Sequence, residues 1–164
     1  MTSPYSVPAG TSIGHVHLKV ANIERALAFY QGLLGFEVML RRGTQAAFIS
    51  AGGYHHHIGL NTWHSLDMPP APKNAAGLFH IALLYPTRKD LSAILRRLID
   101  AGITIEGASD HGVSEAIYLS DPDENGVELY WDKPKSDWPT DDTGALTMIT
   151  KRLDLDKLLA ETAP

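Results

Sequence analysis

The chain has 164 residues, 44% hydrophobic and 20% charged, which is enough for a folded domain with a sizeable core. Its net charge of −5, without any basic run, argues against a nucleic-acid-binding surface. Because cysteine is absent, a disulfide, a thiolate metal site and a cysteine nucleophile are all excluded. We find no signal-peptide pattern and no apolar run of membrane-spanning length, so we expect a cytoplasmic protein without membrane contact.

The first half of the chain predicts a β-α-β-β-β unit. Alternating side chains over residues 13–20 indicate a strand. Asn22 can cap the helix that follows, and Gly35 is expected to end it. Three more strands are predicted over residues 36–40, 46–50 and 55–62.

Three consecutive histidines, His55, His56 and His57, open the last of these predicted strands. Neighbouring side chains of a strand point to opposite faces, so we expect His55 and His57 on one face and His56 on the other. A solvated edge strand would also account for this run taken alone. The chain contains five further histidines, which makes a functional site the better interpretation.

After a proline-rich linker, residues 65–76, the same unit begins again. Thr87 and Asp90 have the spacing of a helix capping box, and Gly102 is expected to end that helix. An Asn-Gly turn signal separates the last two strands. The strands of this second unit are predicted over residues 78–84, 103–106, 116–119 and 126–131.

We therefore expect a single α+β domain over residues 1–164, with two tandem βαβββ modules. The modules span about residues 12–64 and 77–132, and their curved sheets are expected to pair into a half-barrel around a shared cleft. The tail, residues 133–164, is predicted to carry a short helix over 154–160 and to fold back over a module or a second subunit.

The repeat places two histidines at equivalent positions, His15 and His80, which are 65 residues apart. Glu128 stands between apolar residues of a predicted strand, where an inward carboxylate is costly unless it is paired or bound to metal. Two imidazoles and one carboxylate suit non-heme Fe(II), while Mn(II) and Zn(II) remain possible. The position matching Glu128 in the first module is Gly59, so we expect three protein ligands. His17 shares a strand face with His15; we prefer His15 because it is in register with His80.

Three motifs resemble those of the vicinal oxygen chelate superfamily, which includes glyoxalase I, extradiol ring-cleaving dioxygenases, and fosfomycin and bleomycin resistance proteins. The resemblance covers about residues 12–132 and implies the paired βαβββ fold. The motifs are Gly14-His15, Ala26-x-x-Phe29-Tyr30-x-x-x-Leu34-Gly35-Phe36 and Asp121-Pro122-Asp123-x-Asn125-Gly126-x-Glu128-Leu129-Tyr130.

Within that superfamily the chain is most similar to the catechol 2,3-dioxygenase branch. The resemblance implies extradiol cleavage of a small catechol-type aromatic by O₂, and we expect a homodimer. It implies an acid–base residue, His56, a substrate hydrogen-bonding residue, Tyr118, and a further site-lining histidine, His111. The implied metal ligands are His15, His80 and Glu128.

Two other functions stay open on the sequence. A glyoxalase-like lyase or isomerase normally has a fourth protein ligand, at the position where this chain has Gly59. A non-catalytic small-molecule binding protein of the drug-resistance type often lacks metal ligands in its cleft, whereas His15, His80 and Glu128 are all present here.

Overall fold

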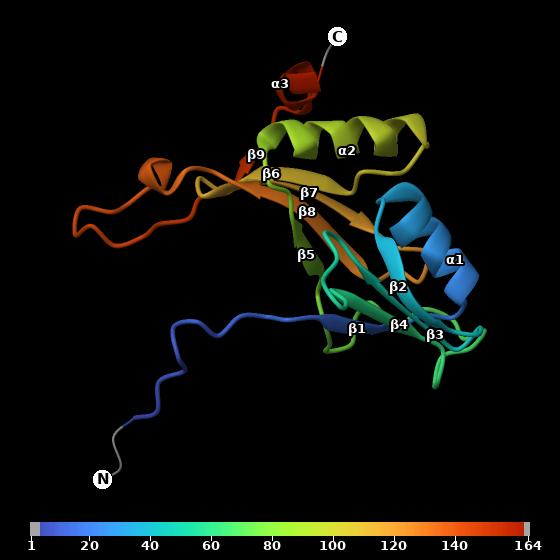
Figure 1. Ribbon diagram of the computed structural model, residues 1–164. Helices are drawn as coiled ribbons and strands as arrows, with labels where there is room; N and C mark the ends of the chain where they lie inside the picture. Colours follow the sequence, from blue (N-terminus) through green and yellow to red (C-terminus); the bar gives the residue numbers. More distant parts are fainter. Residues whose placement is uncertain (1–3, 163–164) are drawn as a thin grey trace.

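The computed structural model describes residues 4–162, which form two mixed β-sheets with helices packed against them (Figure 1). The first sheet has the strand order β1-β4-β3-β2. Its strands are β1 (Val16–Lys19), β2 (Glu37–Arg42), β3 (Ala46–Ser50) and β4 (Ile58–Asn61). The second sheet has the order β5-β8-β7-β6-β9. Its strands are β5 (Ile81–Leu84), β6 (Gly107–Asp110), β7 (Ser114–Ser120), β8 (Gly126–Asp132) and β9 (Lys151–Arg152).

The predicted internal repeat is confirmed by the strand order. In each sheet the first strand of the module runs parallel to the fourth, and the remaining neighbours are antiparallel. Over residues 4–162, neither sheet closes into a barrel. The predicted α+β class with two βαβββ modules is therefore correct.

The helices begin and end where the capping residues predict. The Asn22 side chain accepts the backbone N–H of Arg25 at the start of α1 (Ile23–Leu27), which continues as the π-helical segment η1 (Ala28–Leu33). Gly35 follows with φ +86°, a conformation that glycine adopts at low cost. Thr87 and Asp90 form a complete capping box at the start of α2 (Arg88–Asp100).

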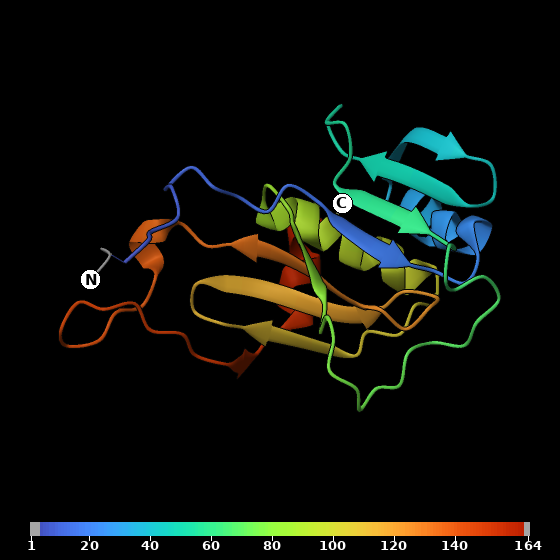
Figure 2. The ribbon, with the colours of Figure 1, turned by 90° about the horizontal axis from the view of Figure 1, so that it is seen from below.

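Helix α2 covers one face of the second sheet, and α3 (Leu155–Leu159) lies on the outer side of α2 (Figure 1). Leu158 of α3 is fully buried there. Figure 2, seen from below, shows the opposite face of this sheet, over which no helix of residues 4–162 lies. The remaining segments are two 3₁₀ turns, η2 (Lys135–Asp137) and η3 (Ala160–Thr162). None of the helices in the described part of the chain has the length and apolar character needed to cross a membrane.

Several predicted strand boundaries are wrong. Residues 103–106 are not a strand: the backbone N–H of Ile103 closes the end of α2, and sheet pairing starts at Gly107, opposite Tyr118. The first strand of each module starts later than predicted, at Val16 and Ile81, because pairing with β4 and β8 starts there. The short β9 was not predicted, since two charged residues carry no strand pattern.

The two modules are joined by polar contacts as well as by a common core. The Tyr30 hydroxyl donates to Asp121 Oδ2 at 2.9 Å, and Arg25 pairs with Asp123 at 2.6 Å. Tyr30 is fully buried, and burial raises the pKa of its hydroxyl, so it stays a donor. The turn before β8 is thereby held against the helix of the first module.

Removing this hydroxyl is expected to weaken the contact between modules. We expect Tyr30→Phe to lower the free energy of unfolding by about 1–2 kcal/mol, since Asp121 loses a buried donor. Urea denaturation measures this, with Tyr5→Phe as the control because Tyr5 is exposed. Equal midpoints for Tyr30→Phe and the unaltered protein would contradict the contact.

Candidate functional site

The carboxylate predicted as a metal ligand lies beside one of the predicted histidines. His80 Nε2 is 2.8 Å from Glu128 Oε2, and the side chains are 30% and 13% exposed, respectively. His80 directly precedes β5, and Glu128 lies on β8, opposite Ala82. His80 Nδ1 is buried and has no hydrogen-bond partner within the described residues. Glu128 is thus the side chain that orients the His80 ring.

Tyr118 and His111 extend this pair into a four-residue chain. Tyr118 lies directly opposite Glu128 in the β7–β8 hairpin, and its hydroxyl is 3.2 Å from Glu128 Oε1. The same hydroxyl is 2.7 Å from His111 Nε2. Burial, followed by the Glu128 charge, raises the pKa of Tyr118 to about 12, so the phenol keeps its proton at neutral pH. Four residues predicted for the site are therefore brought together on the second module.

The other two predicted residues meet on the first module. The rings of His15 and His56 are 4.4 Å apart between centroids. His15 lies just before β1 and is exposed; His56 precedes β4 and is partly buried. Burial and the neighbouring histidines, His15 first among them, lower the pKa of His56. A neutral imidazole at this position can accept a proton at pH 7.

The histidine run does not open a strand, which corrects the prediction of its faces. Strand β4 begins at Ile58, where pairing with Ile49 begins, and the run lies in the preceding loop. His55 and His56 therefore turn toward each other, with their Nδ1 atoms 2.8 Å apart. His57 lies 3.0 Å from Ser50 Oγ. The alternation of side chains between the two faces of a strand does not hold for residues in a loop.

His17 is the residue whose place the sequence left unexplained. It lies opposite Gly59 in the β1–β4 pair, as Ala82 lies opposite Glu128 in the second module. A Cβ on Gly59 would come within 2.8 Å of the His17 ring. The large and the small residue are thus exchanged between the modules, and the His17 ring occupies the space that a side chain at position 59 would need. The feature of the sequence that could have predicted this arrangement is Gly59, because a glycine leaves space for a ring on the neighbouring strand. The His17 ring contacts Phe48 and Trp63 edge-on.

This packing predicts a specific mutational coupling. We expect Gly59→Ala to destabilise the protein by about 1–3 kcal/mol, because the added methyl group displaces the His17 ring. In a His17→Ala background the same change should cost much less. Denaturant unfolding of the double-mutant cycle measures the coupling. Equal costs in both backgrounds would show that His17 does not fill the space.

The donor set fits a divalent metal ion in part. His80 Nε2 and Glu128 Oε2, 2.8 Å apart, offer one imidazole and one carboxylate, which are donor types that bind divalent ions. Among residues 4–162, however, no three histidine, aspartate or glutamate side chains lie close enough to hold a metal. The structure thus assembles two predicted ligands and leaves His15 with the first module.

Comparison with known proteins identifies relatives of this chain. The chain is 42% identical over 156 residues to catechol-2,3-dioxygenase of Bacillus subtilis (strain 168), covering 95% of this chain and 54% of that protein. It is 29% identical over 128 residues to manganese-dependent 2,3-dihydroxybiphenyl 1,2-dioxygenase of Geobacillus genomosp. 3, covering 75% of this chain and 38% of that protein. The chain spans about half, or less, of the length of these two relatives.

A solved structure and a family model agree on the fold. A glyoxalase/dioxygenase from Nostoc punctiforme superposes with a TM-score of 0.64 at 19% identity, covering 80% of this chain and all of that one, a likeness of fold. The family model described as Glyoxalase/Bleomycin resistance protein/Dioxygenase superfamily matches residues 12–129. With its repeated βαβββ modules and this match, the chain belongs to the Glyoxalase/Bleomycin resistance protein/Dioxygenase superfamily.

Proposed function

We propose that this chain is a metal-dependent extradiol dioxygenase that opens the ring of a catechol-type aromatic with O₂. The observation that carries the proposal is the His80–Glu128 pair with Tyr118 beside it, a two-ligand pair next to a phenol. The 42% identity to a protein named catechol-2,3-dioxygenase supports the same reaction.

The metal ligands of the proposal are His15, His80 and Glu128. Fe(II) is the proposed ion because two imidazoles and one carboxylate leave coordination positions open. Mn(II) is the second candidate, since one relative is named as manganese-dependent, and Zn(II) is the third. When bound, the ion would lower the pKa of the diol and hold the diol and O₂ together.

The protein side chains supply proton transfer and orientation in this proposal. His56, neutral at pH 7, takes the proton that a catechol hydroxyl must lose and can return it later. Tyr118 keeps its proton, and its hydroxyl forms a hydrogen bond with a hydroxyl of the substrate. His111 lines the site and holds the Tyr118 hydroxyl at 2.7 Å.

His15 and His56 lie on the first module, not on the second. A single site therefore requires the parts of the two modules that carry these residues to come together, either within one chain or between two copies. His15 and His56 would then face His80 and Glu128. We propose a homodimer, which sedimentation analysis of the metal-loaded protein tests. The proposed partners are the small aromatic substrate and O₂.

A glyoxalase-like lyase or isomerase is the alternative reaction, and a small-molecule binding protein is the alternative without catalysis. Activity assays of the anaerobically Fe(II)-loaded protein separate them. Catechol and substituted catechols should consume O₂, while a glutathione hemithioacetal should remain unchanged. Turnover of the hemithioacetal without O₂ uptake on any catechol would favour the lyase. Tight metal binding with neither activity would favour the binding protein.

A further inference from the structure

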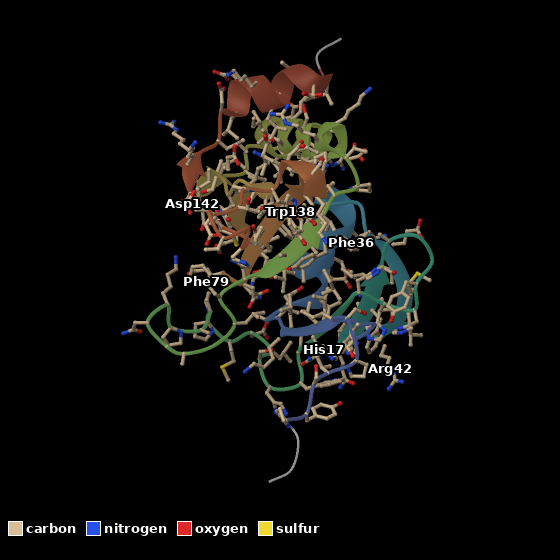
Figure 3. All side chains as sticks on the ribbon, turned by 90° about the vertical axis from the view of Figure 1, so that its left-hand side faces the viewer. His17, Phe36, Arg42, Phe79, Trp138 and Asp142 are labelled. Atoms are coloured by element: carbon tan, nitrogen blue, oxygen red, sulfur yellow. The ribbon has the colours of Figure 1, made fainter. Side chains whose placement is uncertain are left out.

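The tail beyond the second module reaches the candidate site from outside the matched family region, which ends at residue 129. Strand β9 pairs with β6, with Lys151 opposite Asp110 and Arg152 opposite Ser109. The chain just before β9 continues beside the β6–β7 loop, where the backbone N–H of Ile149 donates to the carbonyl of His111 at 3.1 Å. Figure 1 shows the tail leaving the end of the second sheet as an extended loop, in which Figure 3 labels Trp138 and Asp142.

The contact between tail and loop is tight at Gly112. This residue is buried and has φ +80°. A Cβ at this position would lie 2.8 Å from Pro139 Cγ and 3.2 Å from Ile149 Cγ1. The tail therefore fixes the loop that carries His111, both by packing and by backbone hydrogen bonding.

The tail also places hydrogen-bond acceptors against one ring nitrogen of His111. His111 Nδ1 lies 3.2 Å from the carbonyl oxygen of Ile149, which can only accept. The Thr150 hydroxyl, 3.4 Å away, can accept as well. A hydrogen bond to the Ile149 carbonyl requires the proton on Nδ1, and in the neutral ring this leaves Nε2 as an acceptor that faces Tyr118.

Tyr118 has one hydroxyl proton and two neighbouring acceptors. His111 Nε2 is at 2.7 Å and Glu128 Oε1 at 3.2 Å. With Nε2 as an acceptor, the shorter contact takes the proton. Tyr118 then presents a lone pair rather than a proton to Glu128, and Glu128 Oε1 remains a free acceptor while Oε2 stays beside His80 Nε2.

We infer that the Ile149 carbonyl is a positioning group: it holds His111 in the Nδ1–H tautomer, which draws the Tyr118 proton away from Glu128. This deepens the proposed function, on which it rests for the roles of Tyr118 and Glu128. The tail thereby keeps the carboxylate available to a cation, although it touches neither the cation nor the substrate.

The tautomer can be read directly from two-bond ¹H–¹⁵N correlations of the full chain labelled with ¹⁵N-histidine, at pH 8. His111→Gln identifies the signal by its loss. We expect the Nδ1–H pattern in the unaltered protein and in Tyr118→Phe, because the tail sets it and not the phenol. Gly112→Ala should lose the pattern, since the methyl group pushes Pro139 and Ile149 away.

Gly144→Ala is the matched control, because Gly144 has φ +82° but open space where a Cβ would stand. It carries the same backbone strain and should keep the Nδ1–H pattern. An Nε2–H pattern in the unaltered protein, loss of the Nδ1–H pattern in Tyr118→Phe, or its retention in Gly112→Ala would each overturn the inference. Since the spectra need neither metal nor substrate, absence of ring cleavage would leave this result standing.

Discussion

Glu128→Gln is expected to lower the affinity for Fe(II) by at least about 100-fold, because it removes the one charged ligand of the candidate site. The amide keeps the shape of the side chain, so the β7–β8 hairpin should stay folded. Binding is measured anaerobically by titration against a competing chelator, with Zn(II) as a redox-inert second ion. Glu124→Gln is the matched control: it makes the same charge change in the turn just before β8.

His15→Ala belongs to the same experiment, because His15 is the predicted ligand that the structure leaves apart from the pair. Loss of binding in both His15→Ala and Glu128→Ala would establish one site built from both modules. Full metal occupancy in both variants would remove the site assignment. Loss in Glu128→Ala alone would keep His80 and Glu128 and exclude His15 as a ligand.

His56→Ala should keep the metal and lose turnover by about 100- to 10,000-fold, which is the usual contribution of a positioned general base. The reason is its place: the ring touches His15 and is kept neutral by burial and by surrounding histidines. Steady-state oxygen uptake by metal-loaded protein measures the effect.

His64→Ala is the control for this prediction, since His64 is an exposed histidine near the end of the same module. It should leave both the metal content and kcat unchanged. If His56→Ala retained normal kcat at full metal occupancy, the base would have to be another residue.

The local signals of the sequence predicted the fold well. Strand β3 lies over residues 46–50, as predicted, and the caps at Asn22 and Thr87 form as their side chains predict. Gly35 and Gly102 both adopt positive φ at helix ends. Each of these features depends on a few residues that are neighbours in the sequence, so the local sequence pattern is enough to predict it. The division of residues 1–164 into domains stays a prediction.

The candidate site was predictable where a hairpin forms it and not where packing between modules forms it. Tyr118 and Glu128, ten residues apart, become direct partners because the turn between them lies at the midpoint. The His80 contact follows from the parallel β5–β8 pair in the repeated module. The place of His15 relative to this group depends on how two whole sheets pack, which no short-range pattern encodes. The role of the tail beside His111 depends on an edge pairing of two residues, too short to produce a periodic signal.

If this chain opens a catechol ring with O₂, each molecule of ring-opened product takes up one molecule of O₂. The most direct test is the stoichiometry of O₂ consumed to ring-opened product formed by Fe(II)-loaded protein, followed with an oxygen electrode and by visible absorbance in one cuvette. We expect one O₂ per yellow extradiol product on at least one catechol, and no product from Glu128→Gln. Full metal loading with neither O₂ uptake nor product across the catechol panel would contradict the proposed dioxygenase function.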